Sequence, residues 1–201
     1  FIKERANAKF DETVEIAIHG RGGQAAKTCG EMLTHALYCK GLHPHGQPRY
    51  TADRMGAPVS YAIRFRPDGS RVFDRSWSHR PQFVLLFDLS LVEQLDLAST
   101  WEPDATIVLN ARQDAPLPSC LASSRVARVD ATQIARDMRL MKGSVPILST
   151  AMSGAFARVS GLATLDDVLR TIRDVSHAAV GRVVEANLNA ARRGYAEVIL
   201  P

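Results

Sequence analysis

At 201 residues, the chain is long enough to bury one substantial core, and we expect a single domain over residues 1–201, with 1–12 as an N-terminal extension. Its composition, 46% hydrophobic and 23% charged, is that of a globular protein, and no apolar stretch approaches the roughly 20 residues of a membrane span. The formal net charge of +4 is mild, so it gives no indication of nucleic-acid binding.

The cysteines further limit the function. Cys29, Cys39 and Cys120 lie far apart and form no CxxC pair, whereas an iron–sulfur cluster needs several closely spaced thiolates. We therefore expect no cluster on this chain. An odd number of cysteines fits a reducing compartment, so we expect a cytoplasmic protein whose cysteines are mostly buried.

The first predicted element is a short strand. The apolar run Val14–Ile18 leads into the turn "HGRGGQAAK", and apolar residues then recur at three- and four-residue steps from Ala25 to Lys40. This period predicts a helix, which Gly41 ends.

A long irregular segment follows. We expect an extended piece over 42–47, then a loop, "PRYTADRMGAPV", whose length favours a functional role. Alternating residues predict a strand over 59–66, and the turn signal at 67–70 predicts that the chain pairs back from Val72 as a short antiparallel hairpin.

Three apolar runs then predict strands buried on both faces: "QFVLLFDLS", "ATIVLN" and "RVARVDA". Asp88 or Ser90 is suited to cap a short helix after the first run, and Asp130 one over 131–140 after the third. The alternation of strands and helices predicts a three-layer, Rossmann-like α/β domain with a mostly parallel sheet and a short antiparallel hairpin annex.

Two helices complete the chain. Thr164 and Asp167 form a predicted capping box that opens a helix to Val175. An apolar stripe predicts a second helix over 178–193, ending before Gly194.

The glycine turn matches half of a dinucleotide fingerprint. Gly20, Gly22 and Ala25 satisfy G-x-G-x-x-G/A between a strand and a helix, where amides at the helix start favour an anion. The acidic residue that holds the ribose is absent, because the corresponding position reads "HPHGQP". Nor does the turn have the Gly-Lys-Ser/Thr ending of a P-loop.

Other candidate sites are weaker. His43 and His45, with His35 or His79, do not follow a recognised metal spacing, so solvated or hydrogen-bonded histidines are favoured over a metal site. Ser153 lacks the G-x-S-x-G elbow of a hydrolase and lies in a predicted helix. Five arginines lie close together in the sequence, and a solvated hairpin or a docking face for an acidic subunit is favoured over a nucleic-acid patch: Arg64, Arg66, Arg71, Arg75 and Arg80.

Five segments, in order, resemble the gamma subunit, or gamma domain, of 2-oxoacid:ferredoxin (or acceptor) oxidoreductases of the pyruvate synthase type. They are "IAIHGRGGQAAKTCGEML", "PRYTADRMGAPVSYAIRF", "RVDATQIARDM", "PILSTAMSGAFARVSGL" and "EANLNAARRGY". The resemblance covers residues 12–197.

This resemblance implies an oxidoreductase complex that oxidatively decarboxylates a 2-oxoacid and passes its acyl group to coenzyme A. It implies that alpha, beta and delta-type subunits carry thiamine diphosphate and iron–sulfur clusters, and that electrons go to ferredoxin or an NAD-reducing subunit. The chain itself is implied to bind no cofactor alone and no metal, and to be a non-catalytic subunit without nucleic-acid or membrane partners.

Carried over residue by residue, the resemblance places the glycine turn and the loop before residue 59 at the subunit junction or the approach of coenzyme A. The implied contact residues are Gly20, Arg21, Gly22, Gly23, Gln24, Asp53, Arg54 and Gly56.

Several positions depart from the family pattern. Ala25 and Thr51 replace glycines, Asp53 a glutamate, Met55 an arginine and Ser149 an asparagine. Methionine offers no guanidinium donors, so Arg54 would have to take over any anion contact at Met55. The departures suggest a divergent branch, with a substrate other than pyruvate.

Two alternatives remain open for the same turn. The chain could be a free-standing nucleotide-binding module or NAD(P)-dependent dehydrogenase. It could also be a purely structural interaction subunit whose glycines serve only close packing. Independently of that choice, Asp53 and Arg54 could pair with each other in the loop, which is favoured, or reach a ligand.

Overall fold

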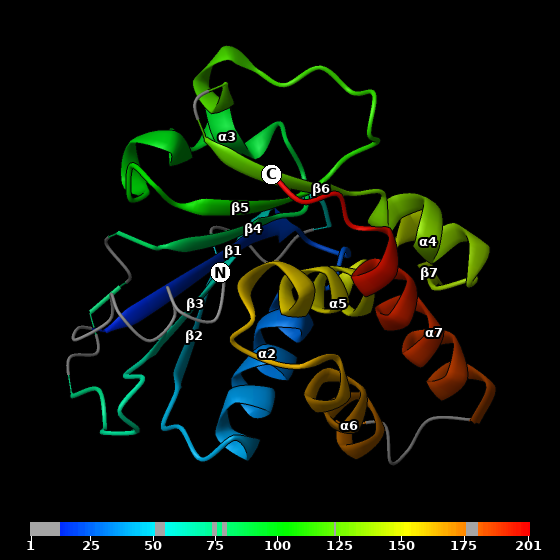
Figure 1. Cartoon of the computed structure of the whole chain (residues 1–201). Helices are drawn as coiled ribbons and strands as arrows, with labels where there is room; N and C mark the ends of the chain where they lie inside the picture. The colour runs from blue at the N-terminus through cyan, green and yellow to red at the C-terminus, as the bar shows by residue number, and fades with distance from the viewer. Residues whose placement is uncertain (1–12, 51–54, 74–75, 78–79, 123, 176–180) are drawn as a thin grey trace.

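A six-stranded sheet forms the middle layer of the computed structural model (Figure 1), which describes residues 13–50, 55–73, 76–77, 80–122, 124–175 and 181–201. The strand order is β2-β3-β1-β4-β5-β6, and β1, β4, β5 and β6 run parallel. β3 is antiparallel to both of its neighbours, β1 and β2. The strands are β1 Val14–Arg21, β2 His45–Tyr50, β3 Pro58–Phe65, β4 Phe83–Leu86, β5 Thr106–Asn110 and β6 Arg125–Val129. The predicted α/β fold with a mostly parallel sheet is confirmed.

Helices cover both faces of the sheet, which gives the predicted three layers (Figure 1). On one face pack α2 Ala26–Cys39, α4 Ala131–Asp137, α5 Ser149–Ser160, α6 Leu165–Val175 and α7 Gly181–Glu197. On the other face, α3 Leu91–Gln94 and two 3-10 turns, Leu97–Thr100 and Ser119–Leu121, cover β4 to β6. Alternate strand residues feed the two cores: Leu85 faces α5, whereas Val84 and Leu86 face α3.

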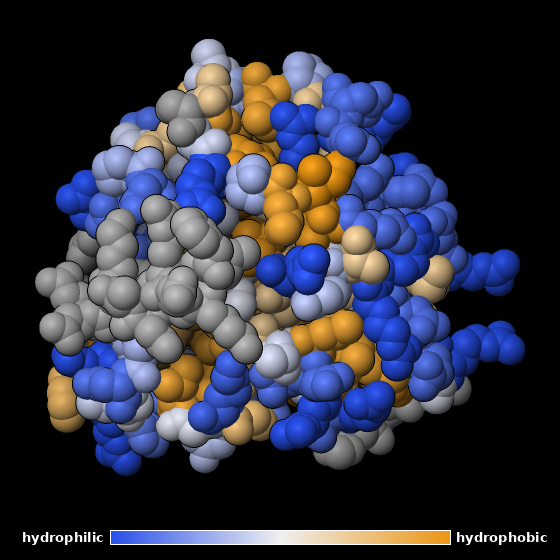
Figure 2. Space-filling view, in the orientation of Figure 1, coloured by the Kyte–Doolittle hydropathy of each residue, from blue (hydrophilic) through white to orange (hydrophobic). Residues whose placement is uncertain are grey.

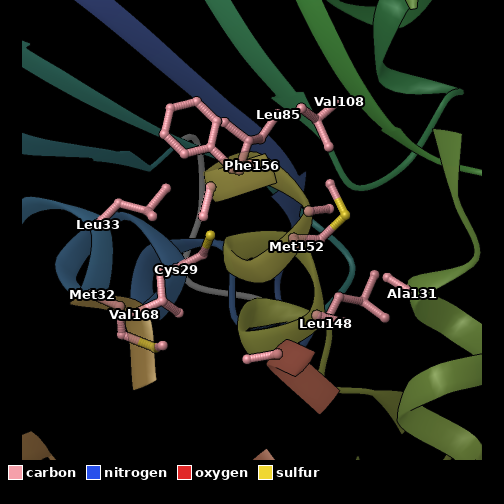
Figure 3. Packing of buried hydrophobic residues seen from close by; sticks show 14 of the residues in the cluster. Cys29, Met32, Leu33, Leu85, Val108, Ala131, Leu148, Met152, Phe156 and Val168 are labelled. Atoms are coloured by element: carbon pink, nitrogen blue, oxygen red, sulfur yellow. The ribbon is translucent and has the colours of Figure 1, made fainter. Parts of the chain in front are cut away.

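Helix α5 lies at the centre of the helical layer, and all of its residues except Arg158 are buried. Figure 3 shows Phe156 of α5 beside Leu85 of the sheet and Met152 on the side of α5 that faces Val108 and Ala131. The ring of Phe156 meets Phe83 of β4 edge to face at 5.8 Å between centroids. A helix buried on every side needs small residues where neighbouring helices come close, and α5 is rich in them.

Two glycines allow α5 and α7 to cross at very short range. A Cβ on Gly154 would lie 2.0 Å from the Ala191 carbonyl oxygen, and one on Gly194 would lie 2.0 Å from that of Ala151. The prediction that Gly194 ends the last helix is therefore wrong, since α7 continues to Glu197. Gly194 allows α7 to approach the backbone of α5 closely, and it is not the C-cap of the helix. The predicted start of this helix, at 178, lies outside the described residues.

The predicted caps of α4 and α6 and the predicted end of α2 at Gly41 are confirmed, whereas the predicted side-chain cap of α3 is wrong, because its N-cap residue, Ser90, makes no side-chain cap hydrogen bond and Asp88 bonds Ser90 instead. Asp130 accepts a hydrogen bond from the Gln133 amide at 2.8 Å at the start of α4. Thr164 and Asp167 bond reciprocally at the start of α6. Gly41 has a φ of +84° where α2 ends.

The predicted hairpin from Val72 is wrong. Among the described residues between 66 and 82 there is no strand, because both edges of β3 are already paired with β1 and β2. The short antiparallel pair lies elsewhere, between β7 Met141–Lys142 and β8 Val145–Pro146. β2 itself starts three residues later than the predicted extended piece, at His45.

The chain ends beside β6, where Ile199 and Arg128 exchange two backbone hydrogen bonds. Ile199 and Leu200 remain 40% and 43% exposed. Figure 2 shows apolar atoms on the face where the chain ends, with polar atoms around them. Among the described residues, no helix combines the length and apolar character needed to cross a membrane.

Candidate functional site

The predicted site residues that the structure describes, Gly20–Gln24 and Gly56, come together at one edge of the sheet, where the parallel strands β1 and β4 end. The glycine turn, Gly20–Gln24, follows β1, and the β4–α3 turn, 87–90, follows β4. Carboxyl ends of parallel strands form the usual ligand-binding edge of an open α/β sheet. Together with Met55–Ala57, these segments are called the glycine-turn site below.

Local packing, backbone conformation and a hydrogen bond explain several of the residue types in and beside the glycine turn. A Cβ on Gly20 would lie 2.8 Å from that of Ala26, so this glycine lets α2 pack on the end of β1. Gly23 has a φ of +101° and Ala25 one of +64°. The Gln24 side-chain oxygen accepts a hydrogen bond from the Arg21 amide at 2.7 Å, which closes the turn.

The turn pairs with the segment that precedes β3. The Gly22 amide donates to the Ala57 carbonyl at 2.8 Å, and the Gly56 amide donates to the Gly22 carbonyl at 3.0 Å. Met55 covers Gly23, since its methyl carbon would lie 2.7 Å from a Cβ there. The methionine that replaces the family's arginine is thus an apolar cover over the turn and is 59% exposed.

Arg21 is held by protein groups. Its Nε donates to Asp88 at 2.8 Å, its Nη1 to the Gly56 carbonyl at 3.1 Å, and its Nη2 to Ser90 and Gln94 at 2.7 and 2.9 Å. Burial alone would raise the pKa of Asp88, but hydrogen bonds from Ser90 and Arg21 outweigh it and lower this pKa. The predicted contact residue Arg21 is therefore part of the frame of the site.

The start of α2 has no side-chain cap at the site. Its N-cap residue, Ala25, makes no side-chain cap bond, and the first turn carries no acidic residue. The first amides of a helix have no intrahelical acceptor, and the helix dipole favours negative charge there. This end of α2 suits an anionic group better than the occupied guanidinium of Arg21 does.

The strand order does not provide the second half of a dinucleotide site. In that fold, the strand after the first helix lies next to the first strand and presents its carboxylate to the ribose. Here β3 lies between β1 and β2, so the strand that follows α2 is one position farther away. The missing acidic residue noted in "HPHGQP" thus coincides with a different strand order.

His19 precedes the turn and is buried on the β3 side of β1. Its Nδ1 lies 2.8 Å from the Ser60 hydroxyl oxygen, and its carbonyl accepts a bond from the Phe87 amide. Burial lowers the pKa of His19 to about 4, so the ring is neutral near pH 7. It joins the strands that frame the site.

Other predicted positions lie elsewhere. Within the described part of the chain, no three histidine, cysteine or carboxylate residues converge as a metal site. Ser153 is buried in α5 and donates to the Ser149 carbonyl at 2.8 Å. Asp53, Arg54 and His79 lie outside the described residues.

The arginine-rich segment does not form one uniform patch. Arg64 is buried and pairs with Glu15 at 2.9 Å, while Arg66 pairs with Asp68 at 3.6 Å. Arg80 pairs with Glu102 at 3.5 Å. Arg75 lies outside the described residues.

Sequence reasoning missed the acceptors of Arg21. It assigned Asp88 and Ser90 only to a helix cap, and it did not consider Gln94. The available signal was the pair of apolar strands that end at Arg21 and just before Asp88, because neighbouring parallel strands bring such residues to one edge.

The three cysteines are free thiols. Cys29 is fully buried, with its Sγ 3.2 Å from the Ser153 hydroxyl oxygen, and burial raises its pKa to about 12. A thiol of this kind is a poor metal ligand, since the thiolate is the ligating form. Cys39 and Cys120 are exposed, so the prediction that the cysteines are mostly buried is wrong.

Comparison with known proteins identifies relatives along almost the whole chain. Residues 15–197 match the family described as pyruvate ferredoxin/flavodoxin oxidoreductase. A pyruvate synthase subunit PorC from Methanothermobacter thermautotrophicus is 35% identical over 185 residues, which is 92% of this chain and 96% of the relative. The pyruvate/ketoisovalerate oxidoreductases common subunit gamma from Pyrococcus abyssi is 30% identical over 90% of this chain and 95% of the relative.

Solved structures agree with the fold. The pyruvate oxidoreductase subunit PORC from Thermotoga maritima superimposes with a TM-score of 0.78 at 28% identity, over 94% of this chain and 98% of that one. The 2-oxoglutarate:ferredoxin oxidoreductase from Magnetococcus marinus matches with a TM-score of 0.72 at 16% identity. That match covers 92% of this chain but 31% of the other, so the same fold there forms one part of a longer polypeptide.

Proposed function

The chain belongs to the pyruvate ferredoxin/flavodoxin oxidoreductase family, and we propose that it acts as the gamma subunit of a complex that oxidatively decarboxylates a 2-oxoacid to an acyl-CoA and CO2. Electrons pass to ferredoxin or NAD. The observation that carries this proposal is the end-to-end match to gamma subunits, 92% of this chain against 96% of the relative.

We propose that the redox and carbanion chemistry lies on partner subunits of alpha, beta and delta type. The donors of this chain do not fit an iron–sulfur cluster, because Cys29 is buried with a raised pKa and no described group of three ligands converges. Thiamine diphosphate and the clusters are then held by the partners. The free thiols fit the reducing conditions of the cytoplasm, where we place the complex.

The glycine-turn site is our candidate for the approach of coenzyme A. Coenzyme A supplies the thiol that accepts the acyl group, and its phosphates are anionic. The start of α2 has no side-chain cap and no acidic residue in its first turn, so its helix dipole favours an anion there, and Gly22 and Gly23 keep the neighbouring backbone free of side chains. Arg54 is the candidate cation of the adjoining loop, since Arg21 is already bonded to protein groups and Met55 has no charge.

Co-purification tests the assignment to a complex. A tagged chain expressed in its native cell should be recovered with thiamine diphosphate-bearing and cluster-bearing subunits. Recovery of a lone monomer would contradict the proposal, and tight binding of NAD, NADP, FAD or ATP by that monomer would favour a free-standing nucleotide-binding module.

Kinetics of the purified complex test the site. Gly22→Val and Arg54→Gln should each raise the KM for coenzyme A, measured as 2-oxoacid-dependent reduction of a viologen dye. Arg170→Gln, on the exposed side of α6, is the matched control and should leave it unchanged. An unchanged KM in both site variants of a fully assembled complex would refute the coenzyme A assignment.

A further inference from the structure

Arg21 connects four parts of the chain through a single guanidinium. It stands at the end of β1, and its bonds reach Gly56 before β3, Asp88 and Ser90 after β4, and Gln94 at the end of α3. Four of the five N–H groups of an arginine are thereby in use. The side chain is only 26% exposed, as is that of Asp88.

The bond to Gly56 has a particular consequence for the loop before β3. Gly22 already holds this segment through two main-chain hydrogen bonds, and the Arg21 side chain, which also bonds the β4–α3 turn, adds a third. Gly56 has a φ of +80° and is two residues after Arg54 in the chain. Among the described residues, Arg21 is the side chain that bonds both this loop and the β4–α3 turn.

We propose that Arg21 is a positioning residue, which fixes the glycine turn and the 55–57 segment at the distance from α3 that ligand binding requires. This inference rests on the proposed function. Arg21 does not contact the ligand. It holds the main chain that does, and Asp88 keeps it in place as a charged partner with a lowered pKa.

Replacing Arg21 by lysine distinguishes a positioning role, which needs several hydrogen bonds, from a role that needs only a positive charge beside Asp88. Its ammonium is one compact group, so Arg21→Lys keeps a cation for Asp88 but does not also reach Gly56 and Gln94. The matched control is Arg193→Lys. Arg193 is also a bridging arginine, with Asp137 at 2.7 Å and Glu197 at 2.5 Å, and its side chain is 31% exposed.

The first measurement is hydrogen exchange of the Gly56 amide, which donates to the Gly22 carbonyl. In the assembled complex, without coenzyme A, Arg21→Lys should speed this exchange by about tenfold, while Arg193→Lys leaves it unchanged. Unchanged exchange in Arg21→Lys overturns the proposal whatever the site binds.

The second measurement is steady-state kinetics. Arg21→Lys should raise the KM for coenzyme A by about tenfold with kcat within about twofold of wild type, as expected for a misplaced binding group. An equal rise in Arg193→Lys, or a fall in kcat alone, overturns the positioning role. If Gly22→Val and Arg54→Gln raise the KM but Arg21→Lys does not, only this inference fails; if none does, the proposed function fails as well.

Gln94→Met provides a second test if Arg21→Lys does not assemble. It removes one acceptor of Arg21 on the exposed side of α3 and leaves the turn intact. Faster exchange of Gly56 by at least about twofold supports the proposal, and no change refutes it.

Discussion

Replacing Gly154 by alanine should be among the most damaging single-methyl changes in this chain. The added Cβ would lie 2.0 Å from the Ala191 carbonyl oxygen, whereas ordinary contacts begin near 3.4 Å. Helix α7 would have to move about 1.4 Å, and a gap of this size forfeits more than half of the dispersion energy across a contact. The obstacle is backbone, so no side-chain rotation relieves it.

The net cost works out at about 3 kcal/mol. We take the gross cost of overpacking as about 4 kcal/mol, above the usual range of about 1–3 kcal/mol because backbone blocks the new atom, and the better helix propensity of alanine returns about 1 kcal/mol. At about 2–4 °C per kcal/mol for a chain of this size, the melting temperature should fall by about 6–12 °C.

Urea unfolding followed by circular dichroism measures the effect. The control is Gly181→Ala at the start of α7, where an added Cβ meets no atom within 4 Å. Gly194→Ala should match Gly154→Ala, and the double variant should cost less than their sum because both act on one helix crossing. A Gly154→Ala protein within about 0.5 kcal/mol of wild type would refute the reasoning.

Two further predictions concern buried titratable groups. The pKa of His19 is about 4 in the folded chain, whereas its ordinary value is 6.5, so between these pH values the unfolded chain binds a proton that the folded chain does not. The contribution of neutral His19 to the free energy of unfolding should be fully present above pH 6.5, and the free energy of unfolding should fall by roughly 3 kcal/mol as the pH drops to about 4. His19→Gln should flatten this slope in urea titrations while His43→Gln does not, and an unchanged slope in His19→Gln would contradict the assignment. Iodoacetamide should alkylate Cys39 and Cys120 in the native protein and Cys29 only after unfolding, since burial raises the pKa of Cys29 to about 12. Peptide mass spectrometry measures the labelling, and alkylation of Cys29 in the native protein at the rate of Cys39 would contradict its burial.

The arrangement of local elements was predictable from the sequence because local chemistry decides it. The period of apolar residues predicted α2, and the apolar runs predicted β4, β5 and β6 as parallel strands. Burial on both faces holds for the middle of β4 and β5 but is wrong for the edge strand β6, where only Ala127 and Val129 are buried. Asp130 and Thr164 marked the starts of α4 and α6, since a cap acts within its own turn. The family resemblance also came from the sequence, because five ordered segments specify residue identities and not only a pattern.

What the sequence left open depends on contacts between distant parts of the chain. Gly194 followed an apolar stripe and therefore predicted a helix end, but its function is set by Ala151 of α5. The hairpin predicted after 67–70 did not form, because β1 and β2 occupy both edges of β3.

The glycine turn illustrates both contributions. Its sequence determined a tight turn between strand and helix, since glycines permit the positive φ and the close approach of Ala26. Only the tertiary structure placed β3 beside β1 and brought Asp88, Ser90 and Gln94 to Arg21 from 67 to 73 residues away. Strand order and side-chain partners at that separation result from the packing of the whole core, so no local pattern around the turn encodes them.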